Sequence, residues 1–304
     1  MRFAIGIPQF YADGEFDPAA FRAYFTRVEA LGYHSAWTQE QVLGSGPQLG
    51  AIETMTYAAA CTQRLRLGCA VLVSTLHTPV HLAKSLSSLD QLSQGRLEVG
   101  VGTGGGGRPF AAFGMDPDRY VARFSEGVAL MKALWTEPRV TFDGEFWQLK
   151  DAAMEPKPAQ KPLPLWLGGS SPAALRRAVR IGTGFFGAGS VPTAQFAQQV
   201  ETIRAALAEN GQPADGFPIA KRVYLAVEAD AGRARQRLND ALERIYGRRV
   251  PTIEAAAVAG TPDDCVRELR EVAAAGAELI LFSALYDQAE HAERIAVEII
   301  PRLS

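Results

Sequence analysis

This sequence contains few cysteines, no long apolar runs and no excess of charge of one sign. The three cysteines, Cys61, Cys69 and Cys265, are too few and too scattered for a disulfide framework or a zinc knuckle. A reducing compartment is the simplest interpretation. Gly, Pro or charged residues interrupt the apolar runs well below the ~20 residues that span a bilayer. The first residues lack the pattern of a secretory signal. We therefore expect a cytoplasmic protein without a membrane partner.

A basic surface is also missing, since 31 Lys and Arg residues stand against 33 Asp and Glu residues and the formal net charge is −2. This balance excludes the electrostatic footprint of a nucleic-acid-binding protein. Apolar residues make up 47% of the chain and charged residues 21%, which is typical of a globular protein. A chain of 304 residues buries roughly three quarters of its unfolded surface, so its core needs no disulfide or structural metal.

Short apolar runs alternate with amphipathic helical stretches along the whole chain. The runs are mostly continuous, as in parallel strands that are covered on both faces. The expected strands are 3–7, 35–38, 65–73, 97–101, 163–167, 184–186, 219–227 and 278–282. A capping residue followed by proline marks four helix starts. These are Asp17-Pro18, Thr78-Pro79, Ser171-Pro172 and Thr261-Pro262, and a last helix is expected near 289–303. Eight strand–helix units predict an α/β fold, a single (β/α)8 barrel domain over residues 1–304.

Three stretches exceed the plan of a simple barrel, and we expect insertions near residues 104–120, 137–163 and 230–260. The second contains a hairpin signal at Asp143-Gly144 and then a proline-rich segment. The third begins with an additional helix over about 230–246. Active sites of such barrels lie in the loops that follow the strands. We expect the substrate pocket in the loops after the first, second, seventh and eighth strands.

The glycine run GVGTGGGG, residues 100–107, is the most conspicuous local signal. It formally matches G-x-G-x-x-G after a strand, which alone is a weak indication of dinucleotide binding. No helix begins inside the run and three strand–helix units precede it, whereas the dinucleotide fingerprint belongs to a first strand. The run therefore predicts a glycine-rich barrel loop that lets a ligand approach the backbone.

A second signal follows the fifth expected strand, where Gly168, Gly169, Ser170 and Ser171 precede Pro172. The free N–H groups of a helix N-terminus, beside small residues and hydroxyls, form an anion site. We favour a phosphate here, with the turn 187–190 as its neighbour. The alternative is that Ser171 serves only as the N-cap, and both roles are compatible.

Acid–base candidates are few. Glu40 and Gln41 follow the second strand, where a carboxylate suits acid–base or orienting chemistry, although a turn-capping role fits equally well. His77 follows the third strand and is a candidate for the cleft. His77 and His81 are four residues apart, but no third ligand is near, so we expect no metal site. No Ser-His-Asp or Cys-His arrangement is present.

The other three histidines are expected to lie away from the reaction. His81 is predicted on a helix surface or in packing, His34 at the bottom of the barrel and His291 facing solvent on the last helix.

Three blocks of sequence, 64–104, 155–186 and 260–287, resemble the luciferase-like monooxygenase superfamily, and the resemblance covers nearly the whole chain. It implies a (β/α)8 barrel with insertions, usually dimeric, that uses reduced FMN with oxygen or the deazaflavin coenzyme F420. The chain is more similar to the F420-dependent oxidoreductases. The resemblance then implies hydride transfer between C5 of the coenzyme and a small organic substrate. The alternatives are an FMNH2- and oxygen-dependent monooxygenase and a non-catalytic flavin-binding protein.

The resemblance also implies cofactor-binding residues. The bond Ala70–Val71 matches a cis peptide that supports the flavin-like ring in relatives. The segment Gly102, Thr103 and Gly104 matches the loop beside the ring. Residues 168–171 match the phosphate cradle, with Gly187 across from it.

Two departures limit the comparison. Many relatives carry Asp-His or Glu-His after the second strand, where this chain has Glu40-Gln41, so a histidine-dependent mechanism is not implied. Gly105 stands where some sugar-phosphate F420 dehydrogenases have an acidic residue. The longer anionic tail of F420 would need cations, for which Arg108, Arg176, Arg177 and Arg180 are candidates, unless they form surface ion pairs.

Overall fold

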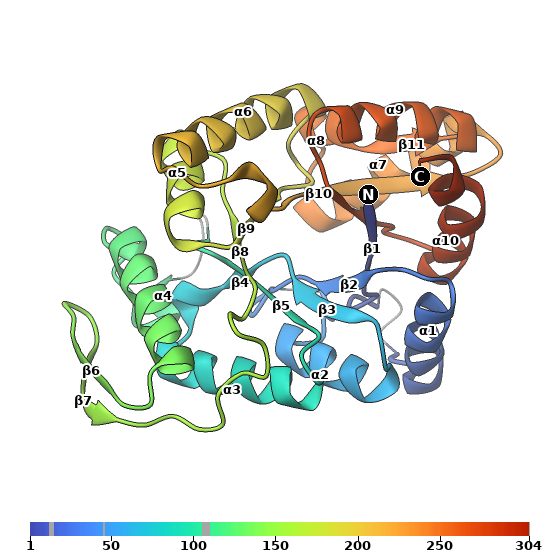
Figure 1. The fold of residues 1–304 in the computed structure, drawn as a ribbon. Helices are drawn as coiled ribbons and strands as arrows, with labels where there is room; N and C mark the ends of the chain where they lie inside the picture. The colour runs from blue at the N-terminus through green and yellow to red at the C-terminus, as the bar shows by residue number, and fades with distance from the viewer. Residues whose placement is uncertain (12–14, 45, 105–109, 304) are drawn as a thin grey trace.

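The computed structural model describes residues 1–11, 15–44, 46–104 and 110–303. Eight parallel strand positions close into a barrel in the order β1, β2, β3, β5, β8, β9, β10, β12 and back to β1 (Figure 1). This confirms the predicted (β/α)8 barrel. The barrel strands are β1 (Arg2–Gly6), β2 (Ser35–Thr38), β3 (Arg66–Cys69) with β4 (Leu72–Val73), β5 (Leu97–Gly102), β8 (Leu165–Gly168), β9 (Gly184–Gly187), β10 (Ile219–Val227) and β12 (Leu279–Ser283).

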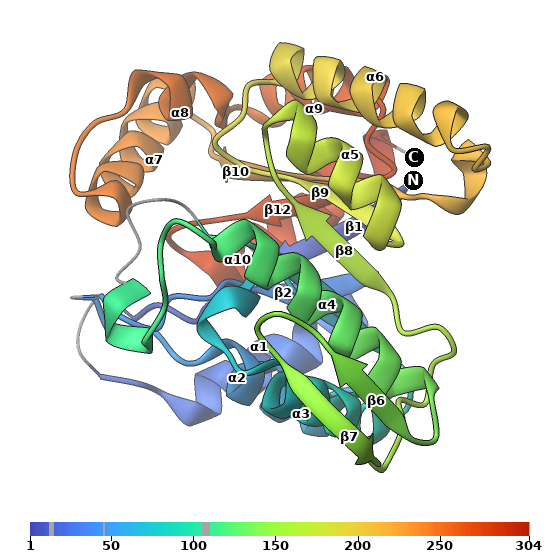
Figure 2. The ribbon, with the colours of Figure 1, turned by 90° about the vertical axis from the view of Figure 1, so that its left-hand side faces the viewer.

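Helices surround the barrel, and the two termini lie side by side at one end of it (Figures 1 and 2). Asp17, Ser171 and Thr261 accept hydrogen bonds from backbone N–H groups of the helices they precede, as their Pro-containing start signals predict. Within the described residues, no helix is long and apolar enough to cross a membrane. The surrounding helices are α1 (Pro18–Ala30), α2 (Ala51–Cys61), α3 (Pro79–Leu92), α4 (Tyr120–Thr136), α5 (Pro172–Ile181), α6 (Thr193–Glu209), α9 (Pro262–Ala274) and α10 (Gln288–Arg294).

Three aromatic side chains from three barrel strands form one buried cluster. The ring centroids of Trp37 and Phe186 are 4.6 Å apart, and Trp166 packs edge-on against both. Such edge-to-face pairs stabilise more than their buried area alone. Phe186 also lines a cavity described below, so this cluster supports the floor of that cavity.

The third barrel position differs from the continuous strand expected over 65–73. It is divided into β3 and β4, and both pair with β5. The peptide bond Ala70–Val71 between them is cis, which confirms the expectation from the resemblance.

Two of the expected insertions contain the predicted elements. The second forms the antiparallel hairpin of β6 (Val140–Asp143) and β7 (Gln148–Ala152), which projects from the barrel in Figure 1. The third contains α7 (Ala231–Tyr246) and two elements that were not expected, α8 (Pro251–Ala256) and β11 (Val258–Gly260). The strand β11 extends the sheet by pairing with β10. Three residues are too few to show a hydrophobic period, which explains why the sequence did not reveal it.

The C-terminal segment departs from the single helix expected over 289–303. The helix α10 passes into a π-helical turn, Ile295–Ile299, and a short 3₁₀ turn that contains Pro301. The prediction that His291 faces solvent is wrong, because its residue is only 3% exposed. Its ring packs edge-on against Tyr286. His291 lies on the same helix face as Ile295, four residues later, which is also buried.

Candidate active site

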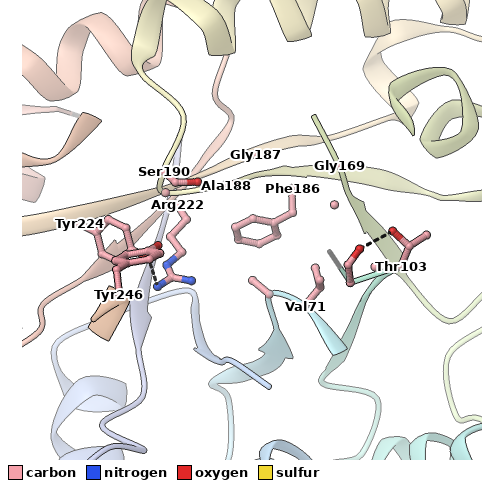
Figure 3. A pocket seen from close by; sticks show the side chains of 15 residues that line it. Val71, Thr103, Gly169, Phe186, Gly187, Ala188, Ser190, Arg222, Tyr224 and Tyr246 are labelled. Atoms are coloured by element: carbon pink, nitrogen blue, oxygen red, sulfur yellow. Dashed lines mark hydrogen bonds between the residues drawn. The ribbon is translucent and has the colours of Figure 1, made fainter. Parts of the chain in front are cut away.

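A cavity of about 250 Å³ opens at the carboxyl ends of the barrel strands. Its lining comes from the third to the seventh barrel position and from the end of α7. The wall from the fourth and fifth positions is backbone-rich, whereas the wall opposite carries large polar side chains. Figure 3 shows Thr103 and Gly169 on one side, Arg222, Tyr224 and Tyr246 on the other, and Phe186 between them.

Most of the residues predicted to hold a cofactor meet in this cavity. Those that line it are Ala70, Val71, Gly102, Thr103, Gly104, Gly168, Gly169 and Gly187. Ser170 and Ser171 are exposed and do not line it, and the Ser171 hydroxyl accepts a hydrogen bond from Ala174 N as the N-cap of α5. The cofactor roles of all ten residues stay predictions.

The Val71 side chain explains why position 102 is glycine. A Cβ atom at Gly102 would lie 2.7 Å from Val71 Cγ2, whereas one at Gly168 would make an ordinary contact, 3.4 Å from Val71 Cγ1. Because real Cβ contacts are longer than 3.0 Å, a side chain at 102 would displace Val71 from the cavity floor. Gly102 therefore leaves the Val71 side chain in place on the floor of the cavity.

The structure joins two of the three acid–base candidates. His77 Nε2 lies 2.7 Å from Glu40 Oε1, and the Val73 N–H donates to Glu40 Oε2. The Glu40 side chain is only 7% exposed and that of His77 28%. Neither residue lines the cavity, but Glu40 binds the strand β4 that directly follows its floor residue Val71. Gln41 is exposed and outside the cavity lining, so the structure does not bring it to the pair.

A second, larger cavity of about 460 Å³ lies near the same end of the barrel. Aromatic side chains form part of its lining, among them Phe10, Phe16 and Phe21. Its walls follow the first and eighth barrel strands and include α7 after the seventh. These are three of the four loop regions where the substrate pocket was expected, and that role stays a prediction.

The arginines proposed for a coenzyme tail differ in their surroundings. Arg176 forms an exposed ion pair with Glu209, as the alternative for this group foresaw. Arg177 lies over the Phe124 ring, and no ion pair links it or Arg180 to a carboxylate in the described part of the chain. Arg108 and the Gly105 position lie outside the described residues.

Sequence reasoning missed the polar wall of the cavity. Arg222 and Tyr224 lie on β10 and Tyr246 at the end of α7. The sequence did contain a signal, because Lys221 and Arg222 interrupt a strand that is otherwise apolar and entirely buried. Two adjacent cations in a covered strand are rare unless they serve a partner or a ligand.

Lys221 holds the loop that forms part of the cavity wall. Its Nζ atom donates to the carbonyl oxygens of Ala188 and Val191, the second at 2.8 Å, and its residue is 2% exposed. Burial, with a smaller contribution from the neighbouring charge of Arg222, lowers the pKa of Lys221 to about 7.

This shift predicts a pH dependence of stability. The unfolded chain keeps Lys221 protonated up to its ordinary pKa of 10.5, while the native protein releases the proton above about pH 7. The unfolded state then binds more protons, so the free energy of unfolding should rise with pH. We expect this group to contribute a slope that approaches about 1.4 kcal/mol per pH unit above about pH 8 and is about half as steep at pH 7. Urea denaturation across this range should show a correspondingly smaller slope in Lys221→Met. Equal slopes in the two proteins would contradict the assignment.

Comparisons with known proteins identify the family. Residues 1–251 match the model of the luciferase-like monooxygenase family. An F420-dependent glucose-6-phosphate dehydrogenase from Beutenbergia cavernae is 30% identical, and the alignment covers 95% of this chain and 94% of that protein. A protein of the same name from Nakamurella multipartita is 29% identical with the same coverage.

Two solved structures show the same fold. Monooxygenase RslO1 from Streptomyces bottropensis has a TM-score of 0.87 and 24% identity, and the match covers both chains completely. An F420-dependent secondary alcohol dehydrogenase, solved with an F420-acetone adduct, has a TM-score of 0.84 and 18% identity and is also covered completely. With the family model matching most of its length and the barrel and cleft in place, the chain belongs to the luciferase-like monooxygenase family.

Proposed function

We propose that this protein is an F420-dependent oxidoreductase that transfers a hydride between the coenzyme and a small organic substrate. The observation that carries the proposal is the glycine-lined cavity at the carboxyl ends of the strands. It is supported by the relative that aligns with 95% of this chain, which is named an F420-dependent dehydrogenase. Active sites of (β/α)8 enzymes lie at this end of the barrel.

The cavity has the chemistry that a deazaflavin requires. Val71 and Phe186 offer apolar surface for a flat ring, and Thr103 with the backbone of Gly104 and Gly169 offers polar groups beside it. Arg222 is the only charged residue in the described lining, so no carboxylate there would repel a phosphate. Bound F420 would supply the carbon, C5, that gives or takes the hydride; the protein would orient the ring, hold the phosphate and exclude water.

Glu40 and His77 supply the proton chemistry in this proposal. The carboxylate of Glu40 orients the His77 ring through one oxygen and holds the backbone of β4 through the other. An imidazole oriented in this way can accept or donate a proton during a reaction. His77 thus takes the place of the histidine that is missing at position 41. Residues 1–304 are proposed to form a single domain that works as a cytoplasmic homodimer, and the unpaired thiols of all three cysteines suit a reducing compartment.

Titration with the two candidate cofactors tests the proposal. We expect F420 to bind about tenfold more tightly than FMN at low salt, because Arg177, which has no ion pair among the described residues, can meet its additional negative charges. The difference between the F420 and FMN affinities should become smaller as salt is added, since screening shortens the reach of exposed charges to about 8 Å at physiological ionic strength. Fluorescence titrations in which FMN binds more tightly at every salt concentration would favour the FMNH2- and oxygen-dependent monooxygenase.

A matched pair of arginine variants sharpens this test. Arg177→Gln should weaken F420 binding about threefold at low salt, while Arg176→Gln should change it less because Glu209 already neutralises Arg176. Turnover of a panel of alcohols and carbonyl compounds, followed by the absorbance of the coenzyme, separates an enzyme from a flavin-binding protein without activity.

A further inference from the structure

Arg222 is a buried cation without an acidic partner among the described residues. Its residue is 9% exposed, its Nε donates to Ser283 Oγ at 3.2 Å, and its Nη2 donates to the Tyr224 hydroxyl at 3.0 Å. In the parts of the chain that the structure describes, no carboxylate forms an ion pair with it and Nη1 has no hydrogen-bond acceptor. A buried guanidinium left without an anion is costly, and this one borders a cavity.

Two tyrosines extend this wall in a fixed direction. The hydroxyls of Tyr224 and Tyr246 lie 2.7 Å apart, and the Tyr224 oxygen already accepts from Arg222. Tyr224 is 3% exposed, and Tyr246 is the one acceptor that the described residues offer to its proton. Tyr224 therefore donates to Tyr246, which leaves the Tyr246 proton free for another acceptor. Tyr246 is 39% exposed and lines the cavity, so this free donor is accessible (Figure 3).

The electrostatic surroundings favour an anion at this wall. Lys221 lies next to Arg222 in the strand, adds positive charge below about pH 7, and also has no carboxylate partner among the described residues. The described lining of the cavity contains no Asp or Glu. The burial of Tyr246 and its bond to Tyr224 raise the pKa of Tyr246, so at neutral pH its hydroxyl is protonated and donates. The wall thus offers one charged and one neutral donor to a single acceptor group.

We propose that Arg222 and Tyr246 bind a carboxylate group of the substrate, so that the substrate is a small organic acid. A planar guanidinium matches the two oxygens of a carboxylate, and the Tyr246 hydroxyl can bind the second lone pair of one of them. A phosphate dianion suits the backbone-rich wall of Gly104 and Gly169 on the opposite side better, because free N–H groups beside a helix N-terminus are available there. The inference rests on the proposed function in assigning that opposite wall to the coenzyme.

Calorimetric titration with benzoate tests this site, with benzamide as the uncharged isostere and inorganic phosphate as the competing anion. Both the coenzyme-free and the F420-loaded protein are titrated. We expect benzoate to bind both forms and benzamide to bind at least about tenfold more weakly. Arg222→Gln should weaken benzoate about 30-fold and Tyr246→Phe about fivefold, as expected for a charged and a neutral hydrogen bond. The F420 affinity should change by less than about twofold in both variants.

Tyr246→Phe keeps the proposal testable if Arg222→Gln folds poorly, since Tyr246 is half-exposed. Tyr57→Phe is the matched control, because Tyr57 has the same 39% exposure but lies on α2 outside the cavity. Unchanged benzoate affinity in both cavity variants overturns the proposal, as does binding of phosphate without benzoate. Equal losses of benzoate and F420 affinity would assign Arg222 to the coenzyme instead. If F420 does not bind at all, the proposed function fails, while the coenzyme-free titration still decides this site.

Discussion

Gly169→Val should weaken F420 binding by about 100-fold or more. A Cβ atom at position 169 would lie 2.7 Å from Ala174 Cβ, closer than real Cβ atoms approach. Ala174 is fixed in the first turn of α5, where its N–H bonds to Ser171. The loop between β8 and α5 must therefore move away from the cavity. The free N–H groups at this helix start would then lose the phosphate, and each charge-assisted hydrogen bond contributes about 1.5–3 kcal/mol.

The measurement is a fluorescence titration of F420 with parent and variant, beside a thermal melt of each. Gly216→Val is the matched control, because a Cβ there meets only Pro213 at 3.9 Å. Gly216 precedes β10 at the end of the barrel opposite the cavity, so this variant should bind F420 like the parent. A folded Gly169→Val protein with unchanged affinity would place the phosphate elsewhere.

Glu40→Gln and His77→Ala should each lower kcat about 100-fold, for any alcohol or carbonyl compound that the parent turns over. General acid–base catalysis contributes about 10²–10⁴-fold to enzymatic rates. Because His77 Nε2 and Glu40 Oε1 lie 2.7 Å apart, the two act as a unit. The double variant should therefore be about as slow as either single variant, since residues of one unit are strongly non-additive.

His81→Ala provides the control for this pair. His81 lies four residues after His77 on α3 and is exposed, so its loss should leave kcat within about twofold. The F420 affinity of the Glu40 and His77 variants should stay close to that of the parent, because neither residue belongs to the glycine-rich wall that is proposed to hold the coenzyme. Additive losses of kcat in the double variant would contradict the idea that the two residues act as a unit. If kcat falls only in proportion to a loss of thermal stability, the contact is structural and not catalytic.

The barrel itself was predictable from the sequence for a physical reason. A parallel strand that is covered on both faces is mostly apolar along a continuous run, without the alternation of a half-exposed strand, and this is why the expected runs 35–38 and 219–227 coincide with β2 and β10 despite the charged pair in the second. Helix starts were equally local, since Asp17, Ser171 and Thr261 cap helices through side chains only two or three residues away. Elements without such local signals, such as β11, were missed.

The candidate site was predictable only in its backbone-rich half. Glycine runs at the ends of strands stand out in a sequence, and eight of the ten predicted cofactor-binding residues do line the cavity. The burial of His291 could not be predicted in this way, because it depends on how α10 packs against Tyr286 and the barrel. The same holds for Gln41, whose neighbour Glu40 turns inward while Gln41 remains exposed.

By itself, the sequence determined which segments become strands and helices, and therefore which loops gather at the carboxyl end of the barrel. Only the tertiary structure decided which side chains meet there. Glu40 and His77 are 37 residues apart in the chain, and Tyr224 and Tyr246 are 22 apart. Secondary structure depends on interactions between near neighbours, whereas these contacts form only when barrel closure brings distant loops together. The proposed role of the buried Arg222 charge depends on tertiary structure in the same way, because the cavity that it borders is built from several separate segments.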